Sequence, residues 1–574
     1  MSESESQIDQ GRALLADAQR QGLGATLVAF VRLSGPGWLQ SAITLGGGSL
    51  AGALFLGILG NTSLLWLQLM AIIMGVVMLS AISYVTLSTG ERPFRAINRH
   101  INPALGWGWL IATIMANIIW CMPQYSLCFA AIQKNLASSV ITDSDLAKFT
   151  VSVLILVAAL FALYLNGRQG RAAKAFDLFL KALVGLIVIC FVAVVALLAS
   201  KGQLNWSQIA AGFMPNPSSW FRPAGELGPL LEQVPESMQD YWRVAILKEQ
   251  RAVMIGAAAT AVGINMTFLM PYTLLNRGWD KTFRGLARFD LSTGMAVPYL
   301  AVTSCVVIAA AATFHTKVDD ALLSENPSTF VESADFKGGA DKVLAKRVEH
   351  EVGGIAFDSM DHDTRVRRMA ALPAAEKRIA ASLVHRNAFH LSKALEPLLG
   401  EQRANLVFGI GVFGMGFSTI IILMLINGFA FCEMFDAPLG GTPFTVGCLV
   451  AGLSGAAWPR VWAGEAGFWL PILASSFGMM LLPIAYVTFF VMMNSRAVMG
   501  DERPNGISLG IWNALMGISV LGAIIASVAA IGEKISDKRA GPVVIGMASV
   551  YVVLVLLGFL FRRTDGVKSD ANSD

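Results

Sequence analysis

Long apolar runs separated by short charged stretches constrain this chain more than any other feature of its sequence. Each run has about 18 or more mostly apolar residues, the length that an α-helix needs to cross the hydrocarbon core of a bilayer. Twelve runs can be placed, near residues 36–60, 63–88, 105–135, 147–166, 174–199, 252–275, 291–314, 404–431, 442–459, 467–494, 507–531 and 541–561. The pattern predicts an all-α polytopic membrane protein with about 12 spans.

Composition supports this prediction and excludes other classes. Of the 574 residues, 55% are hydrophobic and 14% are charged, against about 25% charged in a typical soluble chain. The net charge is only +4, and no basic patch interleaved with aromatic residues occurs, so we expect no nucleic-acid partner. The six cysteines all fall in apolar runs without a Cys-x-x-Cys pair, which indicates small core residues and not disulfides or a zinc site.

Orientation follows from the short loops that hold Lys and Arg, because such loops tend to stay in the cytoplasm. Basic residues cluster after the second, fourth, sixth and twelfth runs, so we expect both termini in the cytoplasm, with 1–34 and 563–574 as cytoplasmic ends. Residues 1–24 are polar and lack the apolar core of a signal peptide. The sequence thus predicts an integral protein of the bacterial plasma membrane, with membrane parts at 35–314 and 403–562.

One long polar insert, residues 315–402, separates the seventh and eighth runs and is expected outside the cell. It contains His350, His362, His385 and His390 among many charged residues. A metal site at Asp361–Asp363 with the later histidines is one interpretation. We favour a solvated helical cap, because mixed charges usually mark a wet surface.

Two of the runs carry signals for an interrupted helix. The first has Gly35–Gly37 at its start and Gly46, Gly47 and Gly48 near its middle, and each glycine weakens a helix by about 1 kcal/mol relative to alanine. The sixth has Pro271 within Met270–Thr273, and an internal proline removes a backbone hydrogen bond. Breaks at matching places in two five-span halves predict a transporter site between them. Two packing kinks are the alternative.

The same residues carry a resemblance to the natural resistance-associated macrophage protein (Nramp) family of divalent-metal transporters. The stretch from Gly35-Pro36-Gly37 to Ser41 resembles the start of the first span of the family, and Met270-Pro271-Tyr272 resembles its Met-Pro-His in the sixth. Asn494–Gly500 is similar to the basic exit from its tenth span. The resemblance implies the LeuT-like fold, with two inverted five-helix repeats plus two C-terminal helices.

Departures from the family pattern affect the expected substrate. The metal-binding Asp and Asn of the family fall on Gly46 and Ser49, and its proton-linked His falls on Tyr272. Between Leu105 and Gln133, in the third run, no Asp, Glu, His, Lys or Arg occurs. Among side-chain metal ligands only Met270 is kept. Because a divalent cation usually needs a carboxylate at membrane depth, ordinary proton-coupled metal transport is not what this sequence predicts.

A glycine break exposes backbone N–H groups at the start of the outer half-helix, and such groups suit an anion. We expect Ser49 to cap that half-helix. The candidate substrate-binding residues are Thr44, Gly46, Gly47, Gly48, Ser49, Met270, Tyr272 and Thr273, with Asn117 and Gln124 as candidate pathway residues. The alternative for the glycines is a close-packing seam between helices.

The sequence therefore predicts a secondary-active or facilitative transporter of a small anion such as bicarbonate or a small carboxylate. The alternative is a divalent-cation transporter for Mn²⁺, Mg²⁺ or Fe²⁺ that uses backbone carbonyls, Ser49 and Met270. We expect no cofactor. The coupling ion is not identified, and Na⁺ is one candidate, because a Na⁺ site made of backbone carbonyls and hydroxyls has no recognisable sequence motif. An enzyme is not expected, since no acid, histidine or Walker motif lies at membrane depth. A sensor that works through the insert is the third hypothesis.

Overall fold

A computed structural model describes residues 3–166, 171–384, 401–461, 470–535 and 540–560 of the chain. These residues form helices and no strands. Nine of the described helices are long and apolar enough to cross a membrane, or ten when the bent pair α3 and α4 is taken as one span. The predicted all-α membrane architecture is confirmed.

The first five predicted spans each correspond to a helix or a helix pair. They are α3 (Pro36–Thr44) with α4 (Gly47–Gly60), α5 (Leu65–Thr89), α7 (Pro103–Ala131), α8 (Asp145–Asn166) and α9 (Arg171–Ser200). Local signals set several of their ends. Pro36 and Pro103 each occupy a first helical turn, where the missing N–H costs nothing, and the side chain of Asn102 accepts a hydrogen bond from the N–H of Ala104 at 2.8 Å.

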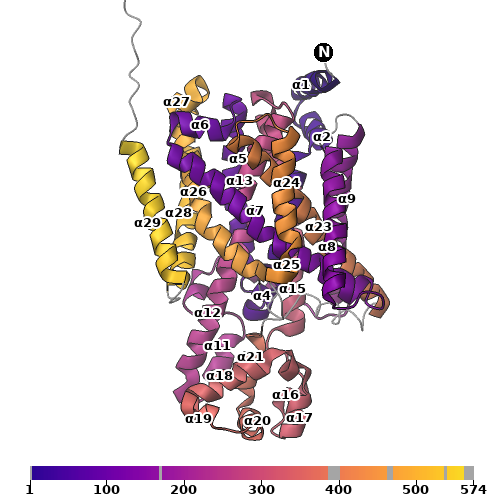
Figure 1. Ribbon diagram of the computed structural model, residues 1–574, viewed down its shortest axis with the longest axis vertical. Helices are drawn as coiled ribbons and strands as arrows, with labels where there is room; N and C mark the ends of the chain where they lie inside the picture. The colour runs from indigo at the N-terminus through magenta and orange to yellow at the C-terminus, as the bar shows by residue number, and fades with distance from the viewer. Residues whose placement is uncertain (1–2, 167–170, 385–400, 462–469, 536–539, 561–574) are drawn as a thin grey trace, which may run out of the picture.

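The next five spans repeat this plan. They are α12 (Glu236–Ala261) with α13 (Ile264–Asn276), α15 (Val297–Phe314), α23 (Glu401–Met434), α24 (Gly441–Ala456) and α26 (Leu470–Asn494). Two further apolar helices follow, α28 (Gly506–Ile535) and α29 (Ala540–Leu560). They pack side by side at one edge of the bundle (Figure 1).

Short helices cover the end of the bundle where the N-terminus lies, which we call the N-terminal side (Figure 1). These are α1 (Glu3–Gln21), α2 (Leu23–Leu33), α6 (Pro93–His100), α14 (Arg284–Asp290) and α27 (Arg496–Met499). Small elements elsewhere are α10 (Trp206–Gly212), α11 (Leu227–Glu232) and α25 (Trp458–Val461). A π-helical turn, Leu291–Ala296, joins α14 to α15.

The described part of the insert forms a helical cap at the opposite end of the molecule (Figure 1). It consists of α16 (Asp320–Leu323), α17 (Pro327–Glu332), α18 (Asp341–Val352), α19 (Gly354–Asp358), α20 (His362–Ala370) and α21 (Ala374–Ser382). The buried carboxylate of Glu376 binds the indole N–H of Trp242 at 2.8 Å and also pairs with Arg347. Because Trp242 belongs to α12, this contact ties the cap to a membrane helix.

The described residues contain no cluster of three or more potential metal ligands, so Asp361–Asp363 gains no partners for a metal site there. His385 and His390 lie outside the described residues. All six cysteines are free, as the sequence predicted, and each is buried except the half-buried Cys305.

Candidate functional site

The first break separates α3 from α4 at Leu45 and Gly46. The two half-helices are bent by 54° relative to each other. Gly46 has an extended backbone (φ −87°, ψ −178°), whereas Gly47 and Gly48 already belong to α4. The break expected in the first span is confirmed.

The second break lies at Val262 and Gly263, not at Met270–Thr273 as the sequence had suggested. Both residues are extended, with ψ values of 114° and 166°, between the end of α12 and the start of α13. Pro271 lies inside the continuous helix α13. A proline within a buried membrane helix is tolerated when neighbouring groups satisfy the freed backbone, while a β-branched residue followed by glycine favours leaving the helix.

A cavity lies between the two breaks. Its lining comes from α3 and α4, the end of α12 and start of α13, the third span α7, and spans α23 and α26. The lining residues are Ile43, Gly46, Gly48, Ser49, Trp120, Pro123, Gln124, Thr260, Met266, Thr419 and Ala474. None of these side chains is charged, so the cavity is neutral.

The glycines of the first break allow close approach of neighbouring spans. A Cβ added to Gly46 would lie 2.6 Å from the hydroxyl of Thr419, and one added to Gly47 would lie 2.7 Å from Leu127. The N–H of Gly47 donates a 2.9 Å hydrogen bond to Oε1 of Gln124. The run is therefore both a packing seam and one wall of the cavity.

Two side chains at the break differ from expectation. Ser49 does not cap α4, because its hydroxyl donates back across the break to the carbonyl oxygen of Thr44. Thr44 is buried and does not line the cavity; its hydroxyl donates to the carbonyl oxygen of Gln40 at 2.7 Å and contacts the Met266 sulfur at 3.6 Å. Because α4 already begins at Gly47, Ser49 lies within its first turn. From there its hydroxyl bonds to the Thr44 carbonyl oxygen and does not cap the helix.

The structure does not bring Met270, Tyr272 and Thr273 to the cavity. They lie in α13, two or more turns beyond the second break, and are buried. The ring of Tyr272 stacks on Phe268 with centroids 4.4 Å apart. Their role in substrate binding was inferred from a break at Pro271, and the break lies eight residues earlier.

Met266 occupies the position that the sequence had given to Met270. Its sulfur lines the cavity and accepts the N–H of Gly263 at 3.5 Å. Thr260 and Thr419 are further lining residues that sequence reasoning missed. Gly263, three residues before Met266, was the signal that could have located the break, while nothing local marks Thr419.

Only one of the two predicted pathway residues of the third span lines the cavity. Gln124 lines the cavity, but Asn117, two turns earlier on α7, does not. Neither polar side-chain atom of Asn117 has a hydrogen-bond partner among the described residues. Gln124 therefore joins the site, and the role of Asn117 stays a prediction.

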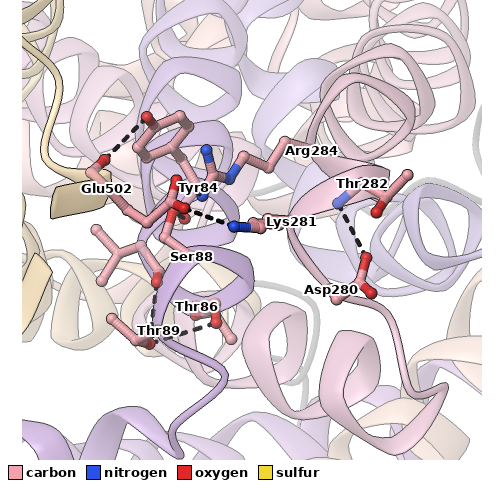
Figure 2. Close-up of polar contacts among 10 residues, drawn as sticks. Tyr84, Thr86, Ser88, Thr89, Asp280, Lys281, Thr282, Arg284 and Glu502 are labelled. Atoms are coloured by element: carbon pink, nitrogen blue, oxygen red, sulfur yellow. Dashed lines mark hydrogen bonds and ion pairs between the residues drawn. The ribbon is translucent and has the colours of Figure 1, made fainter.

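Ion pairs join several elements on the N-terminal side of the bundle. Glu502 pairs with Lys281 at 2.8 Å and with Arg284 at 2.6 Å, and the hydroxyl of Tyr84 donates to its backbone carbonyl at 3.1 Å (Figure 2). These contacts join α5, the segment after α13 and the segment after α26. A second pair, Arg92 with the buried Glu433 at 2.8 Å, joins the start of α6 to the end of α23.

Comparisons with known proteins agree with this architecture. The family model described as natural resistance-associated macrophage protein-like (Nramp) matches residues 37–326 and 370–531. A crystal structure of the Eremococcus coleocola manganese transporter in complex with an aromatic bis-isothiourea substituted compound matches with a TM-score of 0.59 and 15% identity, over 93% of each chain. Structures of two mutants of that transporter match with the same TM-score and coverage at 13% identity. The search of curated proteins gave no match.

The matched residues cover most of the chain, including both breaks and the ten spans of the two repeats. The structural matches show the LeuT-like fold, with two inverted five-helix repeats followed by α28 and α29. The protein is therefore a membrane transporter, and it belongs to the Nramp family.

Proposed function

We propose that this chain carries a divalent metal cation across the membrane by alternating access around the cavity between its two broken spans. Membership of the Nramp family and the likeness to structures described as a manganese transporter support a metal substrate. The observation that carries the proposal is the bond from the Gly47 N–H to Gln124. It occupies a donor at the start of α4 that an anion would need.

The remaining groups around the cavity are mostly acceptors for a cation. Ile43 and Thr260 lie in the last turns of α3 and α12, so two helix C-terminal ends, each with about half a negative charge, approach the cavity. The hydroxyl oxygens of Ser49 and Thr419 and the sulfur of Met266 add uncharged electron pairs. The N-terminal ends of α4 and α13 also line the cavity with the opposite partial charge, so we propose that the cation lies nearer the two C-terminal ends.

No carboxylate is found among the lining residues, so we propose that the ion keeps part of its hydration shell. Mg²⁺ in particular loses water reluctantly and is commonly bound through its waters. The amide of Gln124 and the hydroxyls of Thr260 and Thr419 can accept hydrogen bonds from such waters. The Met266 sulfur already contacts the Thr44 hydroxyl and the Gly263 N–H, so little preference for soft metals is expected.

The anion expected from the sequence is the weaker candidate. Its binding relied on a Ser49 cap and on hydroxyls of Tyr272 and Thr273. Ser49 bonds to the Thr44 carbonyl instead, and the other two residues lie outside the cavity. Bicarbonate is nevertheless the proper competitor in a test, because the cavity is neutral.

The test is uptake by the purified protein in proteoliposomes. We expect Mn²⁺ and Mg²⁺ to enter, detected by trapped metal-sensitive dyes, and no bicarbonate flux. Because no lining side chain titrates near neutral pH, metal entry should move no protons, and replacing external Na⁺ by choline tests Na⁺ coupling in the same assay. Bicarbonate flux without metal flux would overturn the proposal.

A matched pair of substitutions ties the flux to the cavity. Thr419→Val removes a lining hydroxyl, whereas Thr303→Val removes a buried hydroxyl from α15, away from the cavity. Both hydroxyls donate to their own helix at 2.8 Å, and the Thr419 hydroxyl also lies 3.3 Å from the carbonyl oxygen of Ala42 in α3. We expect Thr419→Val alone to raise the KM for Mn²⁺ severalfold.

A further inference from the structure

Helix α2 presents an apolar face outward at the N-terminal side. Successive residues of an α-helix are about 100° apart, so Leu23, Leu27, Val28 and Val31 share one side. Their exposed fractions are 85%, 50%, 70% and 65%. The opposite side is covered, because Ala29 is buried, and at the edge of the face the ring of Phe30 packs on Phe289 with centroids 5.4 Å apart.

This arrangement is the reverse of a helix that faces water, whose outward side is polar. A helix whose outward side faced water would not be expected to have these apolar residues on that side. Spanning does not explain them either, since 11 residues extend only about 16 Å, half of a hydrocarbon core. The preceding helix α1 is polar and holds charged pairs such as Arg12 with Asp280, so it stays in water.

The surroundings of α2 are the lipid-facing ends of membrane spans. Its last residue precedes Ser34, whose carbonyl accepts a 2.8 Å hydrogen bond from Lys181 of α9. On the same span, Leu178 and Phe179 are 68% and 40% exposed, as expected for side chains that face lipid. Figure 1 shows α2 and α9 on the same edge of the bundle.

We propose that α2 lies in the interface of the bilayer, with Leu23, Leu27, Val28 and Val31 in the acyl chains. The end of α2 is held beside α9 through the bond from Lys181 to Ser34, and α9 exposes Leu178 and Phe179, so a lipid surface is the occupant that we assign. Exposed Arg20 and Arg32 flank the apolar stretch and suit anionic headgroups. Because α2 leads through Ser34 into α3, the lipid contact also fixes the base of the first broken span.

The test is spin-label accessibility in nanodiscs, which requires no transport and so is independent of the proposed function. Leu27→Cys carries the label on the apolar face, and Gln21→Cys, at the exposed end of α1, is the matched control. Both are made with Cys305→Ser, since the other native cysteines are buried. Collisions of the label with oxygen, which concentrates in the bilayer, indicate a lipid environment, and collisions with a water-soluble nickel chelate indicate an aqueous one.

We expect the label at position 27 to be several times more accessible to oxygen than to nickel, and the label at position 21 to show the reverse. Adding phosphatidylglycerol to phosphatidylcholine nanodiscs should raise the oxygen preference at 27, and Arg32→Gln should remove that increase. Nickel access at 27 would overturn the proposal. So would spin–spin broadening there, which would mean that a second copy of the chain covers α2.

Discussion

The N–H of Gly37 donates a 2.6 Å hydrogen bond to the carboxylate of Asp290, 253 residues away along the chain. The same buried carboxylate accepts the N–H of Gly35 at 3.1 Å and the hydroxyl of Ser34. Asp290 closes α14, just before the seventh span, and thus caps α3 from another part of the fold. A carboxylate at a helix N-terminus satisfies free N–H groups and also complements the helix dipole.

Substitutions at this contact should destabilise the protein. Gly37→Ala would place a Cβ 2.1 Å from the backbone oxygen of Asp290, and Asp290→Ala would leave buried donors unpaired at about 1–3 kcal/mol each. We expect both to lower the unfolding temperature in detergent. Gly517→Ala, in α28 with no atom within 4 Å of the new Cβ, is the control and should be neutral or stabilising. If Gly37→Ala and Gly517→Ala had the same unfolding temperature, the close packing of Gly37 against Asp290 would be wrong.

Gln124→Leu tests the wall of the cavity. It removes the side-chain oxygen that accepts the Gly47 N–H at the cavity wall, and one neutral hydrogen bond is worth about 0.5–1.5 kcal/mol. The KM for Mn²⁺ uptake should rise about 2- to 10-fold. Gln68→Leu, a buried glutamine of α5 outside the lining, serves as control. If the two variants changed KM equally, Gln124 would have no special place at the site.

His315 makes stability depend on pH at the cap end of α15. Its Nδ1 lies 2.7 Å from the carbonyl oxygen of Ile58, and its Nε2 accepts the N–H of Glu226 at 3.0 Å. Burial lowers the pKa of this imidazole below its ordinary value. The unfolded chain therefore binds the proton more tightly, so the stabilisation is present above about pH 6.5 and is lost as the pH falls below it.

We expect the unfolding temperature to fall between about pH 8 and about pH 5, and to fall less in His315→Gln, which keeps a donor and an acceptor. His350→Gln, at a histidine stacked on Tyr241 in the cap, is the comparison variant for the loss of one histidine. If the unfolding temperature of His315→Gln fell with pH as steeply as that of the wild type, groups other than His315 would cause the pH dependence.

Glu502 should act in the same direction as His315, but over a lower pH range. Hydrogen bonds from Lys281 and Arg284 lower the pKa of its carboxyl to about 2. A lowered pKa gives stability that is complete above the ordinary value of about 4.3 and is lost as the pH falls towards 2. Between about pH 8 and about pH 5, Glu502→Gln should therefore reduce the unfolding temperature by a constant amount.

The neighbouring exposed acid provides the comparison. Asp501→Asn removes the same charge from the same turn without touching the pairs to Lys281 and Arg284. Calorimetry should show a smaller effect for Asp501→Asn than for Glu502→Gln. Equal effects would mean that net charge matters and not the pairing.

Apolar patterning predicted the spans because each helix must bury its backbone polar groups within itself in a bilayer. The first break was predictable as well, since three consecutive glycines weaken a helix locally. The second was not. Pro271 is the stronger local breaker, yet packing holds it within α13, while Val262 and Gly263 leave the helix.

The site itself was only partly predictable. Gln124 stood out as a polar side chain in a span without charges, and it does line the cavity. Thr419 reaches the cavity because Gly46 leaves room for α23, which is a property of the packed spans and not of either sequence segment. Helix α2 escaped notice because its 11 residues are too short for the span criterion.

Helix α12 has 26 residues, a rod of about 39 Å. Trp242, near the N-terminal end of α12, donates a hydrogen bond to Glu376 of the cap. Thr260, in the last turn of α12, lines the cavity. One continuous helix thus joins the cap to the cavity wall. A binder that rotates the cap relative to the membrane spans would therefore also move Thr260 in the cavity wall.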